Sequence, residues 1–260
     1  MRRPCGQAVT PAVITYNEEA NIERTLKALE WAENVIVLDS GSTDATERIA
    51  RSFDNVAWRV RPFDTWGGQW GHAFRECGIR TRFTLALDAD MVVTPEFVNE
   101  LETVFLKGQY RSGVLPVTYV TRGRPLMGSI YPDQLRVFEP NVVIAGHEGH
   151  KHTFEAPEPC YRFQHGMLHD DRKPLDHWLR AQLKYAVAED ERIAAIPAPG
   201  LKDRLRHTGL VPWLVGALAY FRSGGPLRGE ASKRYAMERM TFECLLALRI
   251  DERKRLKDGN

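Results

Sequence analysis

The sequence is poor in cysteine, with four thiols among 260 residues and no Cys-x-x-Cys pair. We therefore expect neither a disulfide framework nor a zinc ribbon, and we predict free thiols in a reducing compartment. Long hydrophobic runs are also missing. The longest covers residues 210–221, and its 12 residues fall short of the roughly 20 that a membrane-spanning helix needs. No apolar segment follows the N-terminal arginines, which predicts a chain without a signal peptide.

The total charge is small, but it is unevenly distributed along the chain. Residues 201–260 carry a net charge of +6, whereas the first 200 residues carry −4. A basic, partly apolar C-terminal segment suits an anionic surface such as a membrane leaflet or nucleic acid. An ordinary solvated helix face is the alternative. From these features we expect a cytoplasmic protein that can also lie peripherally at the inner face of a membrane.

The first half alternates short apolar runs with helical patterns. Strands are predicted at 12–16, 35–38, 56–60 and 83–87, and helical spacing or capping residues follow each run. We expect Asn17 or a residue beside it to cap the first helix, and Ser42 or Thr43 to cap the second. Repeated strand–helix units predict an α/β fold with a mostly parallel sheet that is covered by helices on both faces.

Beyond residue 110 the pattern changes. Strands are predicted at 113–120 and 135–138, and the histidine-rich residues 141–170 look like loops. A helix is expected over 175–191, with Leu175, Leu179 and Leu183 on its apolar side. The Pro-Ala-Pro-Gly sequence at 197–200 then separates the globular part from a helical tail.

Three carboxylates fall at predicted strand ends: Asp39, Asp88 and Asp90. Ligands of open α/β sheets bind outside the carboxyl ends of the strands. Two carboxylates that are two residues apart suit a hard divalent cation, with nucleotide phosphates completing its ligand shell. The simpler alternative is that one of these acids only caps a turn.

The ordered motifs carry a family resemblance. The segments AVITYNEEANIERTL, VIVLDSGSTDAT, Gly-Gly-Gln and LALDADMVVTPEF resemble, in this order, the nucleotide-sugar half of family 2 inverting glycosyltransferases, which have the GT-A fold. The second half is similar to the lipopolysaccharide-core β-glucosyltransferase branch, through YPDQLRVF, the His-Glu pair at 147–148 and YFRSGGPLRG. The resemblance covers roughly residues 9–230. It implies a donor-binding half (8–110), an acceptor and catalytic half (111–196) and a helical C-terminal extension (197–260).

The resemblance also implies roles for single residues. The end of the first strand would hold the nucleotide, and Asp39 would contact N3–H of uracil. The segment around Gly68 and Gln69 would lie near the ribose and diphosphate. Asp88 and Asp90 would bind Mg²⁺ or Mn²⁺, with Asp90 the more direct ligand. The residues matched to the end of the first strand are Thr15, Tyr16, Asn17 and Glu18.

An inverting transfer needs a general base near the acceptor hydroxyl. Glu148, in the matched His-Glu pair, is the first candidate, and Asp171 is the next. Asp133 is the third, but its neighbours in QLRVF look structural. A salt bridge to Lys151 or Arg172 is the alternative role for Glu148. By position, His169 matches a late histidine that serves some GT-A enzymes as a further metal ligand, although a packing role is equally open.

Together these features predict a metal-dependent inverting glycosyltransferase that moves a hexose from a nucleotide sugar to a hydroxyl acceptor. UDP is the expected nucleotide, and a lipid-linked or core saccharide is the expected acceptor. Two alternatives stay open: a transferase acting on a protein side chain or a hydroxylated DNA base, and a catalytically decayed protein that binds nucleotides or carbohydrates. A dinucleotide oxidoreductase is not expected, because no G-x-G-x-x-G follows the first strand.

Overall fold

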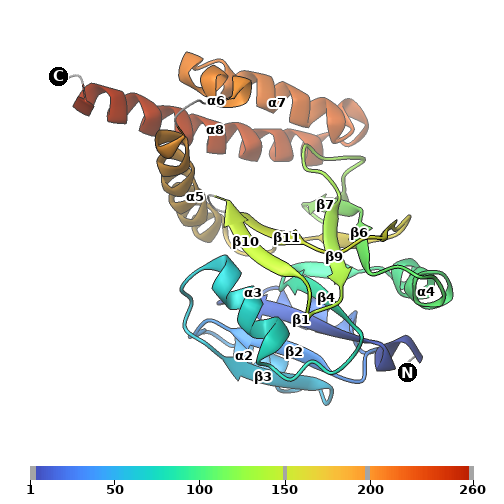
Figure 1. The fold of residues 1–260 in the computed structure, drawn as a ribbon. Helices are drawn as coiled ribbons and strands as arrows, with labels where there is room; N and C mark the ends of the chain where they lie inside the picture. Colours follow the sequence, from blue (N-terminus) through green and yellow to red (C-terminus); the bar gives the residue numbers. More distant parts are fainter. Residues whose placement is uncertain (1–3, 149–150, 197–199, 258–260) are drawn as a thin grey trace. The chain divides into compact units, whose positions relative to one another are not determined.

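The computed structural model describes residues 4–148, 151–196 and 200–257, and the chain forms two compact units (Figure 1). The first unit comprises Met1–Tyr119, Pro132–His147 and His152–Lys173. The second comprises Val120–Tyr131, Glu148–Lys151 and Pro174–Asn260. Strands from the second part of the chain complete the first unit. The division of residues 8–196 into a donor-binding half and an acceptor half of one domain stays a prediction.

The first unit is built around a seven-stranded sheet of order β12-β6-β9-β4-β1-β2-β3. Strands β4, β1, β2 and β3 are parallel, and β9 joins β4 and β6 in antiparallel pairing. The sheet is thus mostly parallel in its donor half, as predicted. Its strands are β1 (Val9–Thr15), β2 (Val35–Asp39), β3 (Val56–Val60), β4 (Phe83–Asp88), β6 (Ser112–Leu115), β9 (Gln134–Phe138) and β12 (Cys160–Arg162).

Strand β1 shows why this sheet is central to the unit. All seven of its residues are buried, as expected for a parallel strand that is covered on both faces. Val9 and Val13 belong to one hydrophobic cluster, whereas Ala12 and Ile14 belong to another. Because neighbouring side chains point to opposite faces of a strand, two cores form, one on each side of the sheet.

Helices α1 (Ile22–Lys27) and α4 (Pro95–Thr103) contribute to the first core, and α3 (Trp66–Arg75) contributes to the second. Thr94 caps α4 as a side-chain acceptor for the N–H of Phe97 at 3.2 Å. The predicted caps of the first two helices were wrong. Helix α1 begins after Asn21 rather than Asn17, and α2 (Thr46–Ala50) begins after Ala45.

A smaller sheet lies beside these strands in the first unit. Strand β13 (Met167–His169) pairs antiparallel with β5 (Met91–Val93) and parallel with the first residues of β7 (Val117–Thr121). In this register His169 lies opposite Met91, the residue after Asp90. The alignment therefore brings together segments that are about 80 residues apart.

The loop prediction for residues 141–170 was wrong, because four short strands fall in it. Besides β12 and β13, these are β10 (Ile144–Glu148) and β11 (Lys151–Glu155), which pair as a two-stranded sheet. The single strand predicted over 113–120 is two strands, β6 and β7, which Pro116 separates. The remaining short elements of this unit are η1 (Pro4–Gln7) and η2 (Phe105–Lys107).

The second unit is helical, as predicted for the tail. Buried residues of α5 (Leu175–Ala195) and α8 (Glu230–Lys257) share a small apolar core. The prediction of an apolar face on α5 was partly wrong: Ala186 is buried, but Leu175 and Leu183 are about half exposed (48% and 51%). The other elements of the second unit are β8 (Arg124–Pro125), α6 (Leu201–Leu205), η3 (Arg206–Thr208), α7 (Val211–Arg222) and η4 (Gly225–Leu227).

A charged cluster is also buried in the second unit. The guanidinium of Arg206, 5% exposed as a residue, pairs with Glu189 at 2.6 Å and with Glu243 at 2.9 Å. Arg192 holds Glu189 from the other side at 3.0 Å.

No helix among the described residues is long and apolar enough to cross a bilayer.

Candidate functional site

Three predicted site residues meet at the carboxyl edge of the parallel strands. Thr15 ends β1 and lies opposite Asp39, which ends β2. Asp88 ends β4 and lies opposite Ile14 in the neighbouring strand β1. The sheet therefore gathers the strand-end residues as the sequence predicted, because parallel strands end at a common edge.

The carboxylate of Asp39 is buried and organises the loop that follows β2. Its Oδ2 accepts hydrogen bonds from the backbone N–H groups of Gly41 (2.9 Å) and Ser42 (2.8 Å). The hydroxyl of Ser42 donates to its Oδ1 at 2.5 Å. In the structure Asp39 is thus a loop-ordering residue, and its contact with a nucleobase stays a prediction.

The same loop is joined to the end of β1 through Asn17. This residue has a left-handed backbone conformation (φ 53°), which asparagine tolerates better than most residues. Its backbone N–H donates to Oγ of Ser42 at 2.8 Å, and its side-chain oxygen accepts from the N–H of Thr43 at 2.8 Å. Tyr16, next to it, is 52% exposed. An aromatic ring is therefore available to solvent at this edge.

Gly68 and Gln69 lie in the first turn of α3. The N–H of Gly68 donates to Oγ1 of the capping residue Thr65 at 3.0 Å, and a Cβ at Gly68 would lie 2.6 Å from Oδ1 of Asp64. Gln69 is buried, and its amide links Arg61 to Ser40, at 2.7 and 3.0 Å. Local packing thus accounts for both residues, and their place near a ribose or diphosphate stays a prediction.

Asp90 and His169 form the centre of the site. Nε2 of His169 lies 3.7 Å from Oδ2 of Asp90, and the histidine ring stacks on Tyr119 with centroids 4.9 Å apart. Oδ1 of Asp90 is buried and has no hydrogen-bond partner among the residues that the structure describes. Burial raises the pKa of Asp90, and the neighbouring carboxylate of Asp88 raises it further, while His169 acts in the opposite direction.

Asp88 is held from the other side by a buried arginine. Nη2 of Arg136, whose side chain is 3% exposed, donates to Oδ2 of Asp88 at 3.1 Å. The same guanidinium donates to the carbonyl of Ala86 at 3.3 Å. Because its partners fix the guanidinium, the orientation of Asp88 is fixed before any ligand binds.

Asp171 belongs to a second cluster in the same unit. Its Oδ1 accepts from Nδ2 of Asn21 at 2.9 Å and from the backbone N–H of Lys173 at 3.0 Å. Nζ of Lys173 lies 2.5 Å from Oε1 of Glu18 and 4.0 Å from Oδ2 of Asp171. Glu18 and Asp171 are therefore brought together, although 153 residues separate them in the sequence.

Charge and burial oppose each other in this cluster. Burial raises the pKa of Glu18 to about 7, although the Lys173 ammonium lowers it. Burial also lowers the pKa of Lys173, but the carboxylates of Glu18, Asp171 and Asp90 outweigh burial and raise it above the ordinary value. Lys173 thus stays charged and balances the acidic site.

Sequence reasoning did not find Asn21 or Lys173. Each is a common residue type in an unremarkable local pattern, and its contacts join parts of the chain that are distant in sequence. Glu148, the first candidate for the base, ends β10, and its side chain lies outside the described residues. Its role therefore stays a prediction.

The donor set fits a hard divalent cation. Carboxylate oxygens are the ligands that Mg²⁺ and Mn²⁺ favour, and an imidazole can complete such a set. The unpartnered oxygen of Asp90 would coordinate the cation, and His169 lies beside Asp90. Within the described residues, no three His, Cys, Asp or Glu side chains converge closely enough to hold a cation without other ligands. A cation at this site would need ligands from a bound molecule as well.

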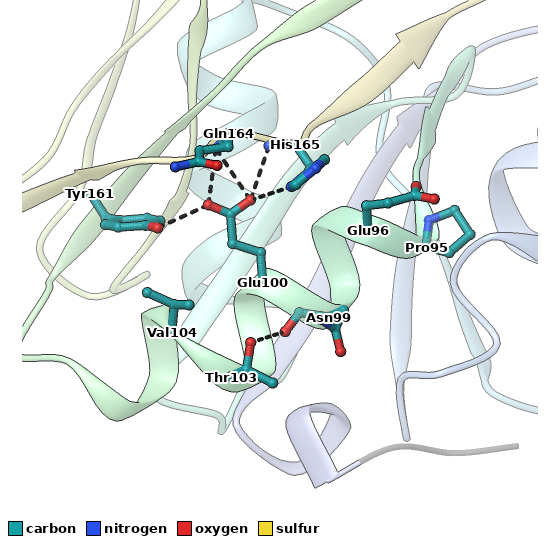
Figure 2. Close-up of a pocket in the computed structure, with 9 residues that line it drawn as sticks. All are labelled: Pro95, Glu96, Asn99, Glu100, Thr103, Val104, Tyr161, Gln164 and His165. Atoms are coloured by element: carbon teal, nitrogen blue, oxygen red, sulfur yellow. Dashed lines mark hydrogen bonds and ion pairs between the residues drawn. The ribbon is translucent and has the colours of Figure 1, made fainter.

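A separate hollow of about 510 Å³ lies along α4 in the same unit (Figure 2). Glu100 lies at its floor and accepts from the backbone N–H groups of Gln164 (2.9 Å) and His165 (3.0 Å) and from the hydroxyl of Tyr161 (2.9 Å). Its hydrogen bonds fasten the segment that leads into β13. Among the predicted site residues whose side chains are described, none lines this hollow.

Comparison with known proteins agrees with this geometry. Residues 12–140, which contain the strand-end residues, match the model of the family "Glycosyl transferase family 2". Residues 12–140 belong to glycosyl transferase family 2. Asp39, Asp88 and Asp90 lie inside the matched family 2 region, whereas His169 and Asp171 lie beyond it.

Curated relatives match this chain over shorter segments than the family model does. It is 32% identical over 82 residues to "Lipopolysaccharide core biosynthesis glycosyltransferase LpsC" of Rhizobium meliloti (strain 1021), covering 30% of each chain. It is 36% identical over 98 residues to an "Uncharacterized glycosyltransferase" of Rickettsia bellii (strain RML369-C), covering 37% of this chain and 32% of the relative. The matched segments thus span about a third of the length of these relatives.

Among solved structures, the chain is similar to S. aureus TarS 1-349 in complex with UDP. The TM-score is 0.50 at 13% identity, over 97% of this chain and 92% of TarS 1-349. At this identity the likeness concerns the fold. The predicted GT-A fold, with a mostly parallel sheet flanked by helices, is confirmed.

Proposed function

We propose that this family 2 protein is a metal-dependent inverting glycosyltransferase, which moves a hexose from a UDP-sugar to a hydroxyl acceptor. The observation that carries the proposal is the pair of Asp90 and His169, in which a buried carboxylate oxygen lacks a partner at the ligand-binding edge of the sheet. A purely structural aspartate would ordinarily be fully hydrogen-bonded at such depth.

Two observations support UDP as the proposed nucleotide. Asp39 matches the position that reads uracil in the family, and the solved TarS structure of the same fold holds UDP. Tyr16 and Asn17 would flank the nucleotide, with the loop of residues 41–43 below it. Mg²⁺ or Mn²⁺, held by Asp90 and His169 with Asp88 nearby, would neutralise the charge that develops on the diphosphate.

The proposed reaction is a single displacement. An oxygen of the acceptor forms a bond to the anomeric carbon of the sugar, while the bond from that carbon to the diphosphate oxygen breaks. UDP leaves with the bonding electron pair, and the acceptor proton passes to a carboxylate. For that base we propose Asp171, whose Oδ2 lies 4.0 Å from the Lys173 ammonium that pairs with Glu18, and we keep Glu148 as the alternative.

The acceptor is proposed to be a lipid-linked or core saccharide, and one feature of the second unit favours a membrane location. An apolar stripe runs along α7 and is widely exposed, with Trp213 and Phe221 each 71% exposed and Leu214 59% exposed. These residues recur at helical spacing, so they share one face. The helix has no acidic residue, and residues 201–260 carry a net charge of +6. We therefore propose peripheral contact with anionic lipid at the cytoplasmic face of a membrane.

A thermal-shift panel tests the proposal. UDP-, GDP-, TDP- and CMP-sugars are each added at about 1 mM with Mn²⁺ or with EDTA, since a ligand that binds the folded state raises its stability. A rise in melting temperature with a UDP-sugar that EDTA removes is the expected result. If no nucleotide sugar raises the melting temperature, the alternative function, that of a catalytically decayed binding protein, replaces the proposed glycosyltransferase activity.

A further inference from the structure

Asn21 lies where α1 begins, and it is almost fully buried (1% exposed). Its Nδ2 donates to Oε2 of Glu18 at 2.7 Å and to Oδ1 of Asp171 at 2.9 Å. Its Oδ1 accepts from Nη2 of Arg24 and from the backbone N–H of Arg172, both at 2.9 Å. Both donors and both acceptor positions of the amide are therefore used.

None of these four hydrogen bonds caps α1 in the usual way. An asparagine at the N-cap ordinarily accepts a hydrogen bond from a backbone N–H of the first turn. The side chain of Asn21 makes no such bond, although Asn21 occupies that position of α1. Two of its bonds join Glu18 and Arg24, three residues away, and the other two reach residues that are 150 and 151 positions away in the sequence. Asn21 therefore ties the start of α1 to the distant segment.

The partners explain why this position needs an amide. Two carboxylates face the nitrogen of Asn21, and two N–H donors face its oxygen. An aspartate would keep the acceptor side, but it would lose both donations and bring a third carboxylate beside Glu18 and Asp171. An aliphatic side chain would leave all four partners without this contact, at a cost that is high in a buried site.

The same helix also holds both sides of the site. Arg24 donates to the carboxylate of Asp170 at 2.5 Å and to its carbonyl at 2.8 Å. Thr25 donates from Oγ1 to the carbonyl of Ala89 at 2.7 Å. The loop that carries Asp90 and the segment that carries Asp171 are thus fastened to consecutive side chains of α1.

We infer that Asn21 is a positioning residue, which fixes the Asp171 carboxylate relative to Asp90 so that the acceptor oxygen is deprotonated next to the bound donor. The inference rests on the proposed function, in which Asp171 is the base. Asn21 itself touches neither donor nor acceptor in this scheme. Its effect should therefore fall on the rate of the chemical step rather than on nucleotide affinity.

The test compares Asn21→Asp with a matched control, Asn55→Asp. The first variant keeps the size of the side chain and its acceptor bonds but removes both donations. Asn55 also donates twice from its amide, to the carbonyls of Leu29 (3.2 Å) and Ala32 (3.0 Å), and these partners are backbone groups outside the site. Three quantities are measured: the melting temperature, the UDP affinity with Mn²⁺ by calorimetry, and kcat and KM for UDP release from the UDP-sugar that stabilises the wild type, with water as the acceptor.

We expect kcat of Asn21→Asp to fall by roughly tenfold to a hundredfold, the usual loss for a residue that orients a ligand or catalytic group. UDP affinity and KM should stay near the wild-type values, because Lys173 still holds Glu18 at 2.5 Å in this variant, and Asn55→Asp should keep its kcat. If Asn21→Asp does not fold, Asn21→Ser makes the same comparison without added charge.

Two results would overturn the inference. The first is a wild-type kcat for Asn21→Asp, and the second is a loss of kcat with a parallel loss of UDP affinity, as a structural role predicts. A wild-type protein that releases UDP from no UDP-sugar would instead remove the proposed function, and the inference with it.

Discussion

Nε2 of His169 lies 3.7 Å from Oδ2 of Asp90, although 79 residues separate them in the sequence. The pairing of β13 with β5 produces this proximity, since His169 lies opposite Met91 in the antiparallel register. Within the described part of the chain, the other carboxylate oxygen of Asp90 has no hydrogen-bond partner. An imidazole thus lies beside a carboxylate with one unsatisfied oxygen at the edge of the sheet, and this arrangement gives the first two predictions.

Replacing Asp90 by asparagine should separate stability from function. The variant should lose the Mn²⁺-dependent thermal shift with UDP-sugar, because the most direct ligand is gone. In EDTA its melting temperature should equal or exceed that of the wild type, because the neutral amide avoids the cost of burying a charged carboxylate. Asp133→Asn is the control, since Asp133 pairs with Arg162 at 2.7 Å on the surface. An unchanged Mn²⁺ response of Asp90→Asn would contradict the metal assignment.

Replacing His169 by alanine should weaken Mn²⁺ binding in the presence of UDP by roughly tenfold to a hundredfold, as losses of metal-site partners do. Calorimetric titration of Mn²⁺ measures the change. His165→Ala is the matched control, because its ring also faces a carboxylate, that of Glu100 at 3.0 Å, but in the separate hollow along α4. Equal Mn²⁺ affinity in the two variants would assign His169 to packing against Tyr119.

The identity of the base is decided by comparing Asp171→Asn with Glu148→Gln. Loss of the base should lower the transfer rate by about 10²–10⁴-fold and leave UDP affinity intact, because the base acts on the acceptor rather than on the nucleotide. We expect this loss for Asp171→Asn. If Glu148→Gln shows the loss and Asp171→Asn does not, Glu148 is the base and Asp171 is a structural partner of Asn21.

The exposed stripe of α7 makes a prediction about lipid. The protein should cosediment with vesicles that contain anionic phospholipid and much less with neutral vesicles. The double variant Trp213→Glu and Phe221→Glu should weaken binding at least tenfold, since burying such a side chain contributes about 1.5–3 kcal/mol. Leu256→Glu changes a residue that is 76% exposed outside the stripe and should bind as the wild type does. If the double variant bound anionic vesicles as tightly as the wild type does, α7 would be excluded as the membrane contact.

Glu189 should make the second unit sensitive to acid. Its carboxylate is partly buried, yet hydrogen bonds from Arg192 and Arg206 lower its pKa to about 2 from the ordinary value of 4.5. Because the folded state binds this proton less readily, the stabilisation is complete above pH 4.5 and is lost as the pH falls toward 2. Glu189→Gln should lower the free energy of unfolding by about 1.5–3 kcal/mol at pH 7.

Urea unfolding followed by circular dichroism measures this difference, which should shrink toward pH 2 because the wild type then loses the same charge. Glu191→Gln, at an exposed position two residues away, should have little effect at either pH. A difference between Glu189→Gln and wild type that does not change with pH would show that packing rather than charge holds Glu189.

The sequence was informative where local pattern and position in the sheet coincide. Buried runs followed by acids predicted β1, β2 and β4 and the edge where Asp39, Asp88 and Asp90 lie, because parallel strands expose their carboxyl ends together. Strands β10 to β13 were missed, since runs of three to five residues with glycine, histidine and proline nearby give no clear alternation. Asn21 was missed for another reason: its role depends on partners 150 residues away, and no local spacing encodes them.

The register of β13 has a consequence for how this site can change in evolution. Side chains alternate across a strand, so a slip of one residue would turn His169 to the other face of its sheet and leave Asp90 without its neighbour. Loops between the strands can lengthen or shorten without this penalty. The spacing of the two residues is therefore inherited through strand alignment, and relatives with very different loops can keep the same pair in place.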